Sequence, residues 1–105
     1  MTYSLQFLSE IEEDAISGYM WYEAKSIGLG EEFLRMFYAS ANEIVWNPLL
    51  HPKVYQDFRR RLLRRFPYAI YFTVEDNRII IFGLFHCARN PHVVNAMLQN
   101  RETMK

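Results

Sequence analysis

Two apolar segments separated by a short polar turn constrain the fold more than any other feature of this sequence. Residues 68–74 and 78–85 are rich in aromatic and β-branched side chains, which favour β-strands. Between them, Asp76 and Asn77 tolerate the positive φ angles of a two-residue turn. The sequence therefore predicts a β-hairpin whose two faces are both apolar, so that each face needs cover.

The two-residue turn also predicts the register of this hairpin. One face should pair Val74 with Ile79 and Phe72 with Ile81, and the other should pair Tyr71 with Phe82 and Ala69 with Leu84. We expect the first face to pack on helices from the N-terminal half. We expect the second face to lack internal cover, because only the polar C-terminal segment remains to lie on it.

The rest of the chain reads as one α+β domain spanning residues 1–105, a usual domain length. Alternation over 3–8 predicts a strand, and helical spacing of apolar residues predicts a helix to about Lys25 and a second one closed by Asn47-Pro48. Gly28-Leu29-Gly30 joins the two helices into an antiparallel hairpin. The remaining segments are predicted as a connecting loop over 48–57, a short helix over 92–97 and a loose tail over about 98–105.

An arginine-rich segment, Phe58 to Phe66, is ambiguous from its periodicity. Helical spacing and strand alternation both fit it, and it carries five arginines: Arg59, Arg60, Arg61, Arg64 and Arg65. Guanidinium groups bind phosphates and carboxylates in a bidentate manner, so the run is a candidate binding patch. An equally good interpretation is a solvated edge strand whose charges oppose aggregation.

Charge is distributed unevenly along a chain that is neutral as a whole. Residues 1–50 hold eight acidic and two basic side chains, and residues 51–105 hold four acidic and ten basic ones. This asymmetry indicates either a polyanionic or acidic partner, or two halves that neutralise each other in the fold.

Composition excludes several classes of protein. Half of the residues are apolar, which is too many for a disordered chain, and a single cysteine, Cys87, rules out an internal disulfide framework. The longest uncharged apolar run, 79–85, is far shorter than the ~20 residues of a membrane-spanning helix. The acidic N-terminus does not resemble a signal peptide. We therefore expect a soluble cytoplasmic protein that contacts no membrane. We also expect Cys87 to be a packed, unreactive thiol.

The order and spacing of several short motifs resemble the RelE/ParE superfamily of toxins from bacterial type II toxin–antitoxin systems. The closer likeness is to the ParE-like, or plasmid stabilisation, branch, and it covers roughly residues 3–91. The matching segments are Trp21-Tyr22-Glu23, Gly28-Leu29-Gly30 with Phe33, Asn47-Pro48, residues 63–68 leading into Ile70-Tyr71-Phe72, Val74-Glu75-Asp76, and Phe85-His86 with Arg89 and Pro91.

This resemblance implies a fold and a function. The fold is an N-terminal strand, an antiparallel two-helix hairpin, a three-stranded antiparallel meander completing one sheet, and a short C-terminal helix, with the arginine run as a strand. The function is that of a toxin that binds and inhibits DNA gyrase and is neutralised by a cognate antitoxin. The resemblance also allows a homodimer of the toxin or a higher toxin–antitoxin complex. Two alternatives stay open: a RelE-like, ribosome-dependent mRNA endonuclease, and an inactive relative.

The resemblance, together with the predicted faces of the sheet, also indicates candidate site residues. Target binding is assigned to Arg60, Arg64, Arg65, His86 and Arg89, and antitoxin binding to Leu62, Tyr71, Phe82 and Leu84. His86 and Arg64 would be catalytic only in an endoribonuclease, since a histidine titrates near neutral pH. Otherwise His86 is expected to hydrogen-bond and shape the loop 87–91.

No metal or cofactor is expected. The three histidines, His51, His86 and His92, lack metal-ligand spacing, and Gly28-x-Gly30 lacks the rest of a phosphate-binding loop.

Overall fold

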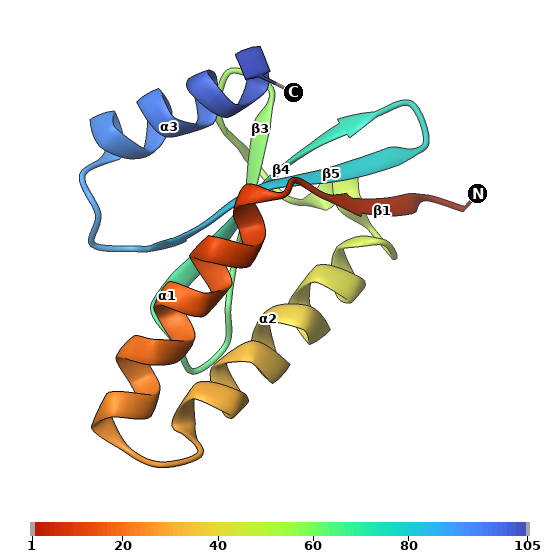
Figure 1. Cartoon of the computed structure of the whole chain (residues 1–105). Helices are drawn as coiled ribbons and strands as arrows, with labels where there is room; N and C mark the ends of the chain where they lie inside the picture. Colours follow the sequence, from red (N-terminus) through yellow and green to blue (C-terminus); the bar gives the residue numbers. More distant parts are fainter. Residues whose placement is uncertain (1, 105) are drawn as a thin grey trace.

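The computed structural model describes residues 2–104, which form a five-stranded sheet with helices on both faces (Figure 1). The strand order is β1-β5-β4-β3-β2, and β1 pairs parallel to β5 while the other neighbours are antiparallel. The elements in chain order are β1 (Ser4–Phe7), α1 (Glu10–Lys25), α2 (Leu29–Ile44), the 3₁₀ turn η1 (Pro48–Leu50), β2 (Lys53–Tyr55), β3 (Phe58–Leu62), β4 (Tyr68–Glu75), β5 (Arg78–His86) and α3 (Pro91–Met104).

The predicted α+β architecture is confirmed, with two local differences. The segment 48–57, predicted as a loop, contains η1 and the short edge strand β2. The arginine run divides at Leu62: residues 58–62 form β3, and the residues after it make a turn in which Arg65 has a φ of 71°. The strand interpretation is thus correct for the first part of the run only.

The central hairpin follows the predicted register near its turn and departs from it further on. Val74 pairs with Ile79 and Phe72 with Ile81, as expected. A β-bulge then leaves Phe82 as the extra residue, so that Tyr71 pairs with Gly83 instead. The predicted pairs of Tyr71 with Phe82 and Ala69 with Leu84 are therefore wrong. Each side chain of β5 after the bulge points to the face opposite to the one that the predicted register gave it.

Close contacts at glycines hold α1 and α2 together. A Cβ on Gly18 would overlap the ring of Phe33, which is fully buried, so only glycine allows this approach of the two helices. Gly28 has a φ of 90° in the connecting turn. The Glu23 carboxylate accepts hydrogen bonds from the N–H groups of Gly28, at 3.0 Å, and Gly30, at 3.0 Å, and so caps the start of α2.

The helical hairpin covers one face of the sheet. The core between them is built from aromatic and aliphatic side chains of α1, α2, β4 and β5, together with two residues of the β3–β4 turn. Its buried members include Ile11, Tyr22, Phe33, Phe37, Ile44, Leu63, Phe66, Ile70, Phe72, Ile79, Ile81 and Leu84.

The second face of the sheet is covered by α3, which lies opposite the hairpin (Figure 1). The predictions of an uncovered face and of a helix ending at residue 97 are both wrong. Residues 98–104, expected as a loose tail, form the second half of α3, and Leu98 is completely buried. The core on this face comprises Phe58, Ala69, Tyr71, Ile80, Phe82, Phe85, Val94 and Leu98.

No helix among residues 2–104 is both long and apolar enough to span a membrane.

Candidate functional site

A cationic end of the sheet forms where the β3–β4 turn meets the loop after β5. The N–H of Cys87 donates to the carbonyl oxygen of Pro67 at 2.7 Å, which joins the turn to the loop. Four of the five predicted target-binding residues lie in or beside these two segments: Arg64, Arg65, His86 and Arg89. We call these four residues the cationic end. The fifth, Arg60, lies in β3 opposite Tyr71, so it projects from the α3 face of the sheet.

Acidic residues of α2 partly neutralise the arginine run. Glu43 accepts from Arg61 at 2.8 Å and from Arg64 at 3.4 Å, and Glu32 accepts from Arg65 at 2.8 Å. The acidic N-terminal half therefore pairs with the basic C-terminal half, which is one of the two interpretations of the charge asymmetry. The Arg64 side chain stays 73% exposed, so its ion pair leaves it accessible to a partner. Arg60 and Arg64 do not share a face, since Arg64 reaches Glu43 of α2 on the hairpin side.

His86 shapes the loop that follows it. Its Nδ1 accepts a hydrogen bond from the N–H of Ala88 at 3.0 Å, which places the proton of the neutral ring on Nε2. The ring also packs edge-on against Tyr68, with the centroids 5.2 Å apart. The structure thus has the loop-shaping bond expected of His86. Because of the bulge, His86 and Leu84 lie on the face of β5 opposite to Ile80 and Phe82.

A pocket of about 410 Å³ lies beside His86. Tyr68, Arg89 and Ser17 bring a phenol, a guanidinium and a hydroxyl to its wall. Burial raises the pKa of Tyr68, while the charge of Arg89 acts to lower it, so the phenol keeps its proton at neutral pH. These groups are hydrogen-bond donors that suit an anionic group of a ligand. The carboxylate of Asp14 also lines the pocket, and it is paired with Arg101.

The predicted antitoxin-binding residues do not form a surface. Tyr71, Phe82 and Leu84 are all buried, the first two beneath α3 and Leu84 under the hairpin. Leu62 is 55% exposed and is the one member of the four that a partner can contact in this structure. The length of α3 explains the cover over Tyr71 and Phe82, whereas the bulge at Phe82 turns Leu84 toward the hairpin.

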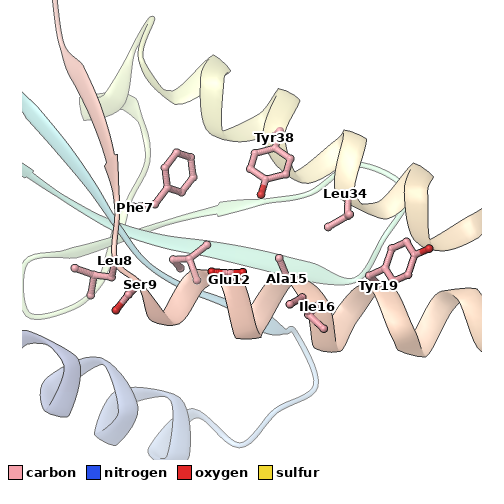
Figure 2. Close-up of a pocket in the computed structure, with 10 residues that line it drawn as sticks. Phe7, Leu8, Ser9, Glu12, Ala15, Ile16, Tyr19, Leu34 and Tyr38 are labelled. Carbon is pink, nitrogen blue, oxygen red and sulfur yellow. The ribbon is translucent and has the colours of Figure 1, made fainter.

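An apolar groove lies between α1 and α2. Its volume is about 580 Å³, and Figure 2 shows its walls from the two helices, with the end of β1 closing one side. Partly exposed apolar side chains from three elements line it, among them Phe7 of β1, Ile16 and Tyr19 of α1, and Leu34 and Tyr38 of α2.

The groove has an acidic rim. Glu12 lines the groove itself, and Glu10 and Glu13 stand beside it in the first turn of α1. Sequence reasoning missed this site, because it gave no role to Ile16, an apolar side chain of α1 that is 49% exposed in the structure.

Across residues 2–104, no three or more His, Cys, Asp or Glu side chains gather in a group that would hold a metal ion. Cys87 is exposed, so the expectation of a packed thiol is wrong. Its backbone N–H, rather than its sulfur, makes the contact that joins the two loops.

Comparison with solved structures identifies the fold. A chain described as "Chromosomal ParDE TA system from P. aeruginosa" matches with a TM-score of 0.67 over 80% of this chain and 95% of its own length. The two chains share one fold. Sequence identity is 18%, so the likeness is one of fold, and at that level it confirms the resemblance predicted from the motifs. Neither a family model nor a curated protein matches the sequence.

Proposed function

We propose that this chain is a ParE-like toxin of a type II toxin–antitoxin system, neutralised in the cytoplasm by a cognate antitoxin. The observation that carries the proposal is the fold shared with a ParDE-system chain along nearly the whole of that chain. The order of motifs in the sequence supports the same family independently, because the fold comparison rests on backbone geometry.

We assign the antitoxin contact to the α1–α2 groove, because α3 covers the sheet face that the sequence had indicated for this contact. A cleft of about 580 Å³ between two helices suits the apolar face of an amphipathic helix, with anchors one or two turns apart. The acidic rim, Glu10, Glu12 and Glu13, favours a helix that carries lysine or arginine beside its apolar stripe. A stable complex of this kind buries roughly 1,600 Å² in total.

The target contact is assigned to the cationic end of the sheet, and the proposed target is DNA gyrase. Inhibition by binding fits the state of His86, whose Nδ1 is engaged by the backbone of its own loop. A RelE-like mRNA endonuclease remains the second candidate. One observation favours it: His86, Arg89 and Tyr68 line the same pocket, where a scissile phosphate would find donors.

Co-purification with the product of the neighbouring reading frame tests the proposal. We expect a stable complex with the wild-type chain, and loss of the complex in Ile16→Asp, which puts a charge into the groove. Ile27→Asp is the matched control, because Ile27 is 95% exposed and lies outside the groove. Failure of the wild-type chain to bind this product would contradict the toxin–antitoxin assignment, and equal binding by both variants would contradict the groove.

A further inference from the structure

A nearly buried ion pair joins α1, α3 and the end of β5. Asp14 of α1 accepts from Arg101 of α3 through both oxygens, with N–O distances of 2.7 and 3.0 Å. Each side chain is only 10% exposed, so this pair is more buried than the ion pairs of the arginine run. The two residues are 87 positions apart in the chain, so the pair depends on the whole fold being assembled.

The same two side chains hydrogen-bond the backbone of β5. Arg101 donates to the carbonyl oxygen of Phe82 at 2.7 Å, and Asp14 accepts from the N–H of Leu84 at 3.1 Å. These bonds begin where the pairing of β5 with β1 stops, because the last backbone bond from that side runs from the N–H of Leu8 to the carbonyl of Ile81. On its other side, β5 stays paired with β4 as far as His86. The pair therefore occupies the place of a neighbouring strand along the end of β5, and it satisfies backbone groups that are costly to leave unpaired.

This end of β5 leads directly into the cationic end. Leu84 stands two residues before His86, and the Arg101 guanidinium also lies over the Phe85 ring, 5.0 Å from its centroid. The same ring lies under Arg89, at 5.4 Å. The backbone bonds and the ring contact together fix the direction in which the chain leaves the bulge at Phe82.

We infer that Asp14 and Arg101 are positioning residues, which hold the end of β5 so that His86 and Arg89 face a bound target in a fixed arrangement. The inference rests on the proposed function in one respect, namely that the cationic end binds gyrase. Its physical content is independent: without the pair, the end of β5 loses both side-chain bonds. The loop from His86 to Arg89 then depends on the pairing of β5 with β4 and on the bond between Cys87 and Pro67.

Two readouts on folded variants test this inference. The first is the imidazole ¹⁵N spectrum of His86, which reports the bond between Nδ1 and the Ala88 N–H. The second is the affinity for purified DNA gyrase. In Arg101→Gln we expect the His86 signals to change and the affinity to fall about tenfold or more, because charge-assisted bonds are lost.

Matched variants separate positioning from stability. Arg101→Lys retains the charge and the ability to donate, so we expect it to restore the His86 signals and most of the affinity. Arg78→Gln removes an arginine ion pair with Glu75 from the other end of β5, and it should change neither readout. Circular dichroism and thermal unfolding establish that each variant is folded at the measurement temperature, and Asp14→Asn replaces Arg101→Gln if the latter does not fold.

The outcomes distinguish the inference from the proposed function. Unchanged His86 signals in folded Arg101→Gln would overturn the inference whatever the target is, and so would changed signals with unchanged gyrase affinity. If the wild-type chain does not bind gyrase, the target assignment fails, and the spectra alone then decide the inference. His86 signals that change in Arg101→Gln and return in Arg101→Lys would support the positioning role. Any other spectral result would contradict it.

Discussion

Gly18 of α1 lies so close to the ring of Phe33 in α2 that a Cβ on the glycine would overlap Cε2 and Cζ of the phenylalanine. The ring has little room to move, because Tyr22, Phe66 and Tyr68 surround it with centroids 4.8 to 5.5 Å away. This contact sets the spacing of the helical hairpin, and with it the width of the groove on the outer side of the two helices.

Gly18→Ala should destabilise the chain although alanine is the better helix former. The gain in helix propensity is about 1 kcal/mol, while forcing a methyl group into a packed core costs about 1–3 kcal/mol. We expect a net loss of about 1 kcal/mol in the free energy of unfolding, measured by urea denaturation. Ser17→Ala, at the exposed neighbouring position, is the control. A stabilised Gly18→Ala variant would show that the helices separate easily.

Glu23→Ala should weaken the start of α2. The Glu23 carboxylate accepts from Gly28 and Gly30 in the helix-connecting turn, a role similar to an N-cap, whose removal costs about 0.5–2 kcal/mol. Glu23→Gln retains one acceptor oxygen without the charge, so its unfolding free energy should lie between those of the wild type and Glu23→Ala. Equal stabilities of all three proteins would contradict the capping role.

His51 should make stability depend on mildly acidic pH. Burial, and then the charges of Arg61 and Arg59, lower the pKa of His51 from its ordinary value of 6.5. The unfolded chain therefore binds a proton at a higher pH than the folded chain does, and stability falls as the pH drops below about 6.5 toward the lowered pKa.

Urea unfolding at about pH 7.5 and 5.5 measures this dependence. The loss of stability between the two conditions should be smaller in His51→Gln than in the wild type. His92→Gln, which removes an exposed histidine from α3, serves as the control. An equal loss in the wild type and in His51→Gln would contradict the assignment.

Arg64→Glu and Arg60→Glu should differ in their effect on gyrase binding. Arg64 belongs to the cationic end, whereas Arg60 projects from the α3 face of β3, so only Arg64→Glu is expected to weaken binding strongly. The fold should survive, because an exposed ion pair such as the one between Arg64 and Glu43 contributes only about 0–1 kcal/mol. Affinity measured on both variants, with circular dichroism as the folding check, decides the question; a larger effect of Arg60→Glu would move the target surface to the α3 face.

Local patterns in the sequence predicted the hairpin turn, both long helices and the register near Asp76 and Asn77. They did not predict the bulge at Phe82, because a Tyr71–Phe82 pair is as apolar as the observed alternative. Gly83 carries the relevant signal, since a Cβ there would overlap the ring of Phe85. The extra residue in the bulge places Leu84 and His86 on the face opposite to the predicted one. Two of the predicted site residues are therefore displaced.

The extent of α3 was missed for a different reason. Its second half is polar in sequence, and Leu98 is its single fully buried apolar residue. What fixes this half of the helix is the bond from Arg101 to Asp14, which no local pattern encodes. The groove between α1 and α2 was missed because exposed apolar residues such as Ile16 become a site only when the two helices stand side by side.

Inhibition of DNA gyrase by the purified chain is the most direct test of the proposed function. In a supercoiling assay we expect inhibition that is relieved by the product of the neighbouring reading frame. His86→Gln should inhibit nearly as well, because glutamine can still accept from the Ala88 N–H although it cannot titrate near neutral pH. An enzyme using His86 as an acid or base would instead lose ~10²–10⁴-fold in rate. Unaffected gyrase, together with ribosome-associated mRNA cleavage that disappears in His86→Gln, would contradict the gyrase assignment and establish the endonuclease.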